Sequence, residues 1–304
     1  MTGAQIRQRL KPWILPAAML CGILFHEYIS HLAFLMPYLI FTMLLITFCR
    51  INPHDFGFSK MIWQLLAVQL IGSIALFFAI APIDRQIAQG LFICVICPTA
   101  TAAPVVTGML GGSVTRLVAY SLVNNVVVAL VAPFLLAWFG DSNIDIFDTT
   151  ISILAQVTPM ILGPLVIALS LRKIATKAHQ MIAARQSLSF YIWSVGLFIV
   201  VAKSVAFIMD EPTNEIPSII AIAIGAGVVC ALQFLIGRKI GLMHGDGISG
   251  AQGLGQKNTI LAIWMTITYL NPIASVGPAA YIAWQNTINS VQLYLHQKNQ
   301  LRKQ

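Results

Sequence analysis

Charged residues are scarce in this sequence. Only 9% of its 304 residues are charged and its mean hydropathy is +0.82, whereas soluble domains carry about 25% charged residues. The apolar segments also lack the alternation of apolar and polar residues that is typical of membrane-barrel strands. They run without interruption for about 20 residues, the length of a helix that crosses a bilayer. The sequence therefore excludes a soluble domain and predicts an all-α integral membrane protein.

Motifs of catalysis are missing as well. The sequence has no HExxH, no paired aspartates within an apolar segment and no serine–histidine pair there. Two of the five cysteines form a CxxC at Cys94 and Cys97. No second ligand cluster accompanies them, which favours small core residues over a metal or redox site. We therefore expect no enzyme, no catalytic residue and no resident cofactor or metal.

Ten apolar segments are predicted to form membrane helices. They span approximately residues 12–27, 33–49, 61–82, 87–110, 114–139, 149–171, 187–209, 216–237, 247–270 and 273–296. All 18 lysine and arginine residues except Arg85, Lys203 and Lys257 then fall on one side. Because positive loops stay in the cytoplasm, we expect a multi-pass protein of the cytoplasmic (inner) membrane with both termini in the cytoplasm. This topology accounts for the net charge of +8 without nucleic acid as a partner.

The ten segments divide into two sets of five, residues 1–148 and 149–304. Five is an odd number, so the second half is inverted relative to the first. The fourth segment of each half is interrupted, by ICPTATAAPVVTG with Pro98 and Pro104 and by GAQGLGQKNT with Gly253 and Gly255. Interrupted helices at matching positions of two halves indicate the binding site of a transporter.

Lys257 directly follows the second interruption. A lysine at the centre of a membrane helix costs about 2.5–3.5 kcal/mol on insertion scales, so such residues usually face a cavity and mark function. Lys203 is only seven residues from Asp210 and can extend to the membrane surface. All ten acidic residues are expected outside the spans, which leaves Lys257 without a carboxylate at membrane depth. It is then either neutral or charged among carbonyl and amide groups, where it balances an anionic substrate or replaces a metal cation. The N-termini of the half-helices add positive potential beside it.

Three motifs resemble those of the bile acid:sodium symporter family. CPTATAAPVVTGML is similar to its first crossover motif, GLGQKNTILA to its second, and GPAAYIAWQNTINS to its tenth helix. The resemblance implies two inverted five-helix repeats in which helices 4 and 9 are broken and cross. It also implies a core domain of helices 3–5 and 8–10, a panel domain of helices 1, 2, 6 and 7, and a substrate site between the two.

The resemblance assigns candidate residues by position. The expected substrate-binding residues are Thr101, Asn258, Thr259, Gln285 and Asn286. The expected residues of the cation site, or of its replacement, are Gln69, Ser121, Asn125, Gln256 and Lys257. Ser121 and Asn125 are spaced i, i+4 and share a helix face, and interhelical hydrogen bonding, worth about 0.6 kcal/mol on average, remains an alternative role for them.

The sequence also departs from the family pattern. Ala103 and Pro104 stand where the resemblance implies a serine and an asparagine that bind sodium, and Gly253 stands in place of a glutamate. Lys257 stands in place of a glutamine. An ammonium about 4 Å from a metal cation costs about 4 kcal/mol at an effective dielectric of 20. Our hypothesis is that Lys257 occupies the space of a sodium ion as a tethered cation, so that transport is independent of sodium.

The predicted function is secondary transport of an organic anion, bile acid-like or a small carboxylate, by alternating access. Two alternatives stay open: a sodium- or proton-coupled symporter that uses the remaining polar ligands, and a passive channel. The expected partners are the anion and the lipid bilayer, and the sequence leaves the oligomeric state open.

Overall fold

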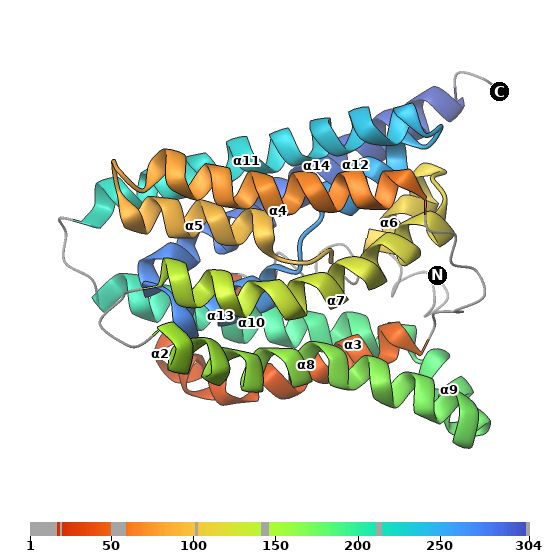
Figure 1. The fold of residues 1–304 in the computed structure, drawn as a ribbon, viewed down its shortest axis with the longest axis horizontal. Helices are drawn as coiled ribbons and strands as arrows, with labels where there is room; N and C mark the ends of the chain where they lie inside the picture. Colours follow the sequence, from red (N-terminus) through yellow and green to blue (C-terminus); the bar gives the residue numbers. More distant parts are fainter. Residues whose placement is uncertain are drawn as a thin grey trace. The chain divides into compact units, whose positions relative to one another are not determined.

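The computed structural model describes residues 17–18, 20–49, 59–100, 103–140, 146–210 and 215–301. All regular elements in this part of the chain are helices (Figure 1). They are α2 (His26–Ile29), η1 (Ser30–Leu35), α3 (Met36–Phe48), α4 (Lys60–Ile80), α5 (Arg85–Ile96), α6 (Ala103–Leu110), α7 (Val114–Phe139), α8 (Ile146–Ile174), α9 (Thr176–Ala183), α10 (Gln186–Asp210), α11 (Ile216–Met243), α12 (Gly247–Gly255), α13 (Thr259–Tyr269), η4 (Pro272–Ser275) and α14 (Val276–Leu301). The prediction of an all-helical chain is confirmed for these residues.

Four helical stretches in the described ranges are long and apolar enough to cross a membrane. They are His26–Phe48, α4, α7 and α11. Their length and composition match a bilayer crossing, which supports the expectation of a protein with several membrane-spanning helices. The number of ten spans, their inverted arrangement and the orientation of the termini stay predictions.

Two stretches between predicted segments contain helices in the structure. The sequence HEYISH, a short joint between the first two predicted segments, forms α2 and the beginning of η1. It contains neither glycine nor proline, and its polar side chains bond to the preceding turn: His26 Nδ1 contacts Ile23 O at 2.9 Å and Ser30 Oγ donates to Glu27 O at 3.4 Å. The interval between the segments predicted at 149–171 and 187–209 contains α9, whose sequence TKAHQMIA likewise lacks helix breakers.

The structure interrupts the fourth and the ninth predicted helices. α5 ends at Ile96 and α6 begins at Ala103, while α12 ends at Gly255 and α13 begins at Thr259. Proline disfavours helical dihedrals in the residue before it, and Cys97, which precedes Pro98, has φ −57° and ψ 142°. No proline marks the second break, where Gln256 is extended with φ −88° and ψ 118°.

An aspartate begins each of the two half-helices that lead into the breaks. Asp84 accepts hydrogen bonds from the backbone N–H of Gln86 at 2.8 Å and of Ile87 at 3.0 Å, at the N-terminus of α5. Asp246 accepts from Ser249 N at 3.0 Å at the N-terminus of α12. These contacts satisfy N–H groups that have no partner within the helix.

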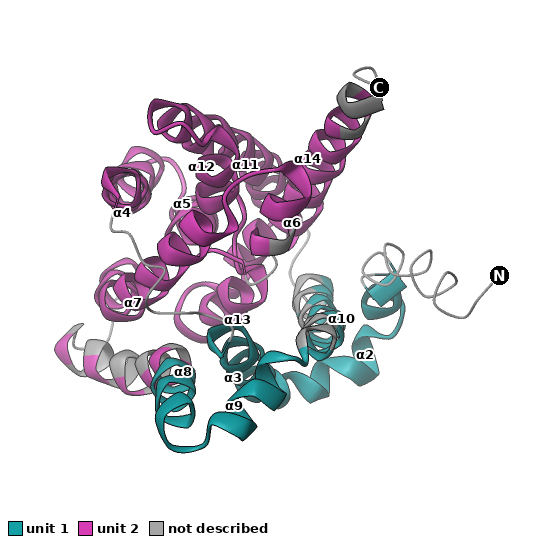
Figure 2. Ribbon diagram, turned by 90° about the vertical axis from the view of Figure 1, so that its right-hand side faces the viewer, with its two compact units in different colours: residues 1–50, 163–213 teal, residues 51–162, 214–304 magenta. Residues whose placement is uncertain are grey.

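The chain forms two compact units, each assembled from two separate segments (Figure 2). Unit 1 comprises residues 1–50 and 163–213, and unit 2 comprises residues 51–162 and 214–304. Each unit therefore takes helices from both predicted halves of the chain. Both breaks belong to unit 2.

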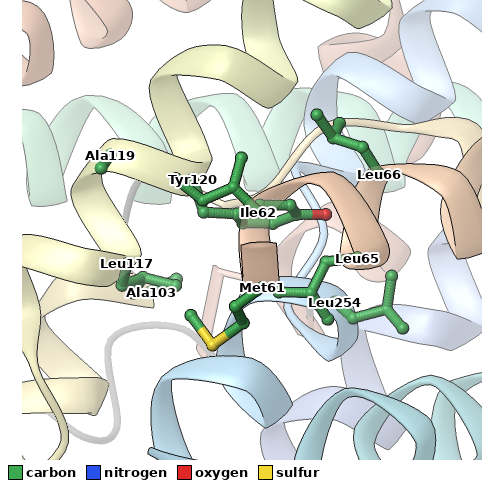
Figure 3. Close-up of a cluster of buried hydrophobic side chains, with 9 residues drawn as sticks. All are labelled: Met61, Ile62, Leu65, Leu66, Ala103, Leu117, Ala119, Tyr120 and Leu254. Carbon is green, nitrogen blue, oxygen red and sulfur yellow. The ribbon is translucent and has the colours of Figure 1, made fainter. Parts of the chain in front are cut away.

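The interior of unit 2 is held by apolar packing and by close contacts between backbones. Figure 3 shows one buried cluster, formed by Met61, Ile62, Leu65, Leu66, Ala103, Leu117, Ala119, Tyr120 and Leu254. It joins α4, α6, α7 and α12. α11 and α12 approach through Gly237 and Gly250, since a Cβ on either glycine would overlap the backbone oxygen of the other. Small residues at helix interfaces allow such close contact in a membrane.

Candidate functional site at the two helix breaks

The two breaks are hydrogen-bonded to each other. Thr99 and Lys257 form an isolated antiparallel bridge. The N–H of Ala100 donates to Gln256 O at 3.1 Å, and the N–H of Asn258 donates to Pro98 O at 2.8 Å. Residues 91–99 and 251–260 are buried throughout. The pairing satisfies backbone groups that would be costly at membrane depth if left unbonded.

Side chains from other segments bond the carbonyl groups at the end of α5. A helix leaves its last carbonyls without partners inside the helix. Three of them accept side-chain donors: Cys94 O from Gln233 Nε2 at 3.2 Å, Val95 O from Lys257 Nζ at 2.8 Å, and Ile96 O from Gln69 Nε2 at 2.8 Å. The C-terminus of a helix carries partial negative charge, so the ammonium group lies where the helix field favours a cation.

Lys257 is 1% exposed. Its backbone is held by Gln285, whose Oε1 accepts from Lys257 N at 3.0 Å and whose Nε2 donates to Lys257 O at 3.5 Å. No carboxylate contacts its ammonium group within the described ranges. The structure therefore gives the Lys257 side chain one backbone carbonyl, that of Val95, as its hydrogen-bond acceptor.

Gln69 is bonded on both sides of its amide. Its Oε1 accepts from Tyr120 OH at 2.9 Å and from Asn124 Nδ2 at 2.9 Å. Asn124 Nδ2 also lies 3.1 Å from Thr99 Oγ1, on the first break. Sequence reasoning did not assign Tyr120 or Asn124 to the site. Their i, i+4 spacing on α7 is the signal that could have paired them.

A second glutamine–tyrosine pair, also missed from the sequence, lies on α11 and α14. Gln233 Nε2 donates to Tyr281 OH at 3.0 Å, and Tyr281 OH donates to Gly255 O at 2.8 Å. Gln233 Oε1 is buried without a hydrogen-bond partner in the described part of the chain. A lone glutamine inside the apolar sequence of α11 was the available signal.

The remaining substrate candidates are only partly brought together. Asn258 caps α13, with its Oδ1 accepting from Leu261 N at 3.3 Å, and its Nδ2 is buried without a partner among described residues. Thr259 follows it and is buried, whereas Asn286 is half-buried on α14. Thr101 lies outside the described residues.

Three candidates for the cation site, Ser121, Asn125 and Gln256, have hydrogen-bond partners other than Lys257 and Gln69. Asn125 Nδ2 donates to Ser121 O at 2.6 Å, within α7, and Asn125 Oδ1 is buried without a partner in the described segments. Gln256 Nε2 donates to Gln252 Oε1 at 2.6 Å. No hydrogen bond found in the described ranges joins the side chains of these candidates to Lys257 or Gln69.

Tyr120 fills the space beside Gly253. A Cβ on Gly253 would lie 2.9 Å from Tyr120 Cδ1, and Tyr120 is fully buried. A larger side chain at position 253 therefore requires the ring to move.

Broken, mutually bonded helices beside long apolar helices are features of a multi-pass membrane transporter. No protein-family model matches the chain. The chain is similar to the protein named "uncharacterized sodium-dependent transporter YocS" of Bacillus subtilis (strain 168), with 22% identity over 227 residues, which are 73% of this chain and 68% of that protein. The distant relative agrees with the class of membrane transporter.

Proposed function

We propose that this protein is a secondary transporter of an organic anion, bile acid-like or a small carboxylate, that works by alternating access. The observation that carries the proposal is the buried Lys257 ammonium at the carbonyl end of a broken helix. In transporters of this kind, half-helix C-termini and unwound carbonyls bind coupling cations, and half-helix N-termini face anionic substrate groups. Lys257 takes the part of the coupling cation.

The arrangement of unit 2 supports two inverted repeats of the kind found in the bile acid:sodium symporter family. Gln69 and Tyr120 pair on α4 and α7, the third and fifth helices of the first half. Gln233 and Tyr281 pair on α11 and α14, the third and fifth helices of the second half. The division into units supports a core and a panel domain, because unit 2 holds α4–α7 and α11–α14 while unit 1 holds α2, α3, α9 and α10.

The atoms at the end of α5 do not fit a sodium ion. The Val95 carbonyl already accepts from the ammonium, and Gln69 Oε1 already accepts from Tyr120 and Asn124. A metal cation about 4 Å from the ammonium would cost about 4 kcal/mol at an effective dielectric of 20, nearly a thousandfold in affinity. This supports transport with weak or absent sodium coupling at this position.

The donors at the second break fit an anion. Asn258 Nδ2 is a buried, unpartnered donor in the described region, and it lies at the N-terminus of α13. Helix N-termini favour carboxylate and phosphate groups through their N–H groups and their dipole. The proposed substrate set also includes Thr101, Thr259, Gln285 and Asn286.

One observation favours the alternative of a symporter coupled to sodium. Asn125 Oδ1 is a buried oxygen without a partner in the described segments, and Ser121 Oγ lies 3.4 Å from Asn125 Nδ2. Oxygen atoms of this kind are the ligands that hard cations prefer. A cation bound there would be separate from the Lys257 position.

Uptake in proteoliposomes tests the two possibilities. A thermal-shift screen of bile acids and small carboxylates first identifies a substrate, and its uptake is then measured with sodium or with choline outside. We expect saturable uptake with counterflow at a rate that is unchanged in choline. Uptake that stops in choline supports the sodium-coupled alternative, and uptake without saturation or counterflow supports a channel. Lys257→Gln is expected to lower uptake, while Lys203→Gln serves as the matched control.

A further inference from the structure

The short helix α9 belongs to unit 1, connects α8 to α10 and has an unusual composition for a connection. Residues 172–185 contain four cations and no acidic residue. The cations are Arg172, Lys173, Lys177 and Arg185. A cluster of cations without acidic residues attracts partners of opposite charge.

One side of this segment packs against its own unit, and the other side is exposed. α9 contacts α3, and Ala178, His179, Ile182 and Ala183 are half-buried. Lys173, Lys177 and Arg185 are exposed. Two large apolar side chains are exposed among them, Ile174 at 86% and Met181 at 64%. The exposed side thus combines cations with apolar groups.

This combination fits one kind of partner. Amphipathic helices that lie in a membrane surface insert their apolar side chains at the boundary of the acyl chains, and their lysine and arginine residues contact anionic headgroups. An acidic protein would match the cations but would leave no special role for Ile174 and Met181. The flanking helices α8 and α10 have 29 and 25 residues, a length that suits a bilayer crossing. In the expected ten-span topology the segment between them lies at the surface of the membrane.

We propose that Lys173, Ile174, Lys177, Met181 and Arg185 form a docking surface for the headgroups of anionic phospholipids. The three cations contact the phosphate groups, and the two apolar side chains enter the boundary region below them. The expected cytoplasmic orientation of these cations agrees with the negative surface of the cytoplasmic leaflet. The bound lipid then holds the α8–α9–α10 connection in place, whatever the transported substrate is.

Thermal unfolding of the full-length protein in detergent tests the docking surface. Phosphatidylglycerol is added to one sample, phosphatidylcholine to a second, and inorganic phosphate to a third. We expect phosphatidylglycerol to raise the midpoint temperature by several degrees, and the other two additions to leave it nearly unchanged. Equal effects of the two lipids, or a phosphate effect as large as that of phosphatidylglycerol, would overturn the proposal.

Variants locate the effect on the molecule. The triple variant Lys173→Gln, Lys177→Gln and Arg185→Gln is expected to lose most of the shift caused by phosphatidylglycerol. A matched triple variant of exposed cations in unit 2, Arg238→Gln, Lys239→Gln and Lys298→Gln, is expected to keep it. Equal losses in both variants would contradict the assignment to α9.

Salt provides a measurement on the unaltered protein, which decides the matter if the triple variant does not fold. At about 1 M salt the Debye length falls to about 3 Å. The shift caused by phosphatidylglycerol is then expected to shrink to the level of phosphatidylcholine. A shift that is insensitive to salt rejects headgroup charge as its cause.

Discussion

The two breaks differ in how the carbonyl groups before them are bonded. At the end of α5 the donors are two glutamine amides and the ammonium of Lys257. At the end of α12 the donors are neutral hydroxyl groups, with Thr99 Oγ1 on Gly253 O and Tyr281 OH on Gly255 O, both at 2.8 Å. Similar backbone geometry is therefore bonded by a lysine side chain at one break only. We infer that the two breaks differ in their electrostatics, because only the carbonyl groups at the end of α5 are bonded by a lysine side chain.

Replacing Lys257, which bonds a carbonyl at the end of α5, should have the largest effect on the free energy of unfolding. Lys257→Met removes a charged donor from Val95 O, and bonds of charged groups contribute about 1.5–3 kcal/mol. We expect the free energy of unfolding to fall by about 2–3 kcal/mol, measured by denaturation in detergent. Lys203→Met, which alters a half-buried lysine in unit 1, should change it by less than about 0.5 kcal/mol. A more stable Lys257→Met protein would mean that the interaction with the end of α5 does not compensate the cost of burying the Lys257 side chain.

Adding a side chain at Gly253, before the second break, should have the second largest effect on stability. In Gly253→Ala the new Cβ meets the Tyr120 ring at 2.9 Å, and overpacking of a buried site typically costs about 1–3 kcal/mol. Tyr120→Leu in the same chain should recover part of that loss, which a double-mutant cycle measures. Strictly additive effects would show that the glycine and the tyrosine are not coupled.

Removing a neutral cap should cost less than removing the charged one. Tyr281→Phe deletes the hydroxyl that bonds Gly255 O, and a neutral hydrogen bond contributes about 1 kcal/mol. We expect a loss of that size in the free energy of unfolding, in the same denaturation experiment as for Lys257. A loss equal to that of Lys257→Met would remove the distinction between the two breaks.

The smallest effect on stability should follow from Asn258→Ser. Serine caps a helix about as well as asparagine, so stability should change by only a few tenths of a kcal/mol. The variant lacks the unpartnered Nδ2 donor, and we expect the affinity for an anionic substrate to fall about tenfold, the equivalent of one hydrogen bond. Unchanged affinity in a ligand titration would place the anion elsewhere.

Local sequence rules predicted the positions of the breaks but not their bonding partners. Pro98 acts on its neighbour Cys97, so the end of α5 could be anticipated from two adjacent residues. Gln233 and Tyr281 meet only because α11 and α14 pack against each other. The sequence also did not predict which way the Gln256 side chain points. The backbone is extended at Gln256, so helical periodicity does not apply there. The helices at HEYISH and at α9 lie between or at the ends of the predicted membrane helices, because polar residues without glycine or proline continue a helix readily.

In the proposed transporter, the hydrogen bond between Lys257 and Val95 has a consequence for the energetics of transport. A cation that belongs to the polypeptide returns with it in every cycle and moves no net charge across the membrane. An organic monoanion transported without a coupling ion then carries its own negative charge through the membrane potential, which is worth about 2.3 kcal/mol per 100 mV. That equals about a fiftyfold concentration ratio. In a cell with a negative interior, such a carrier works against the voltage when it imports and with the voltage when it exports.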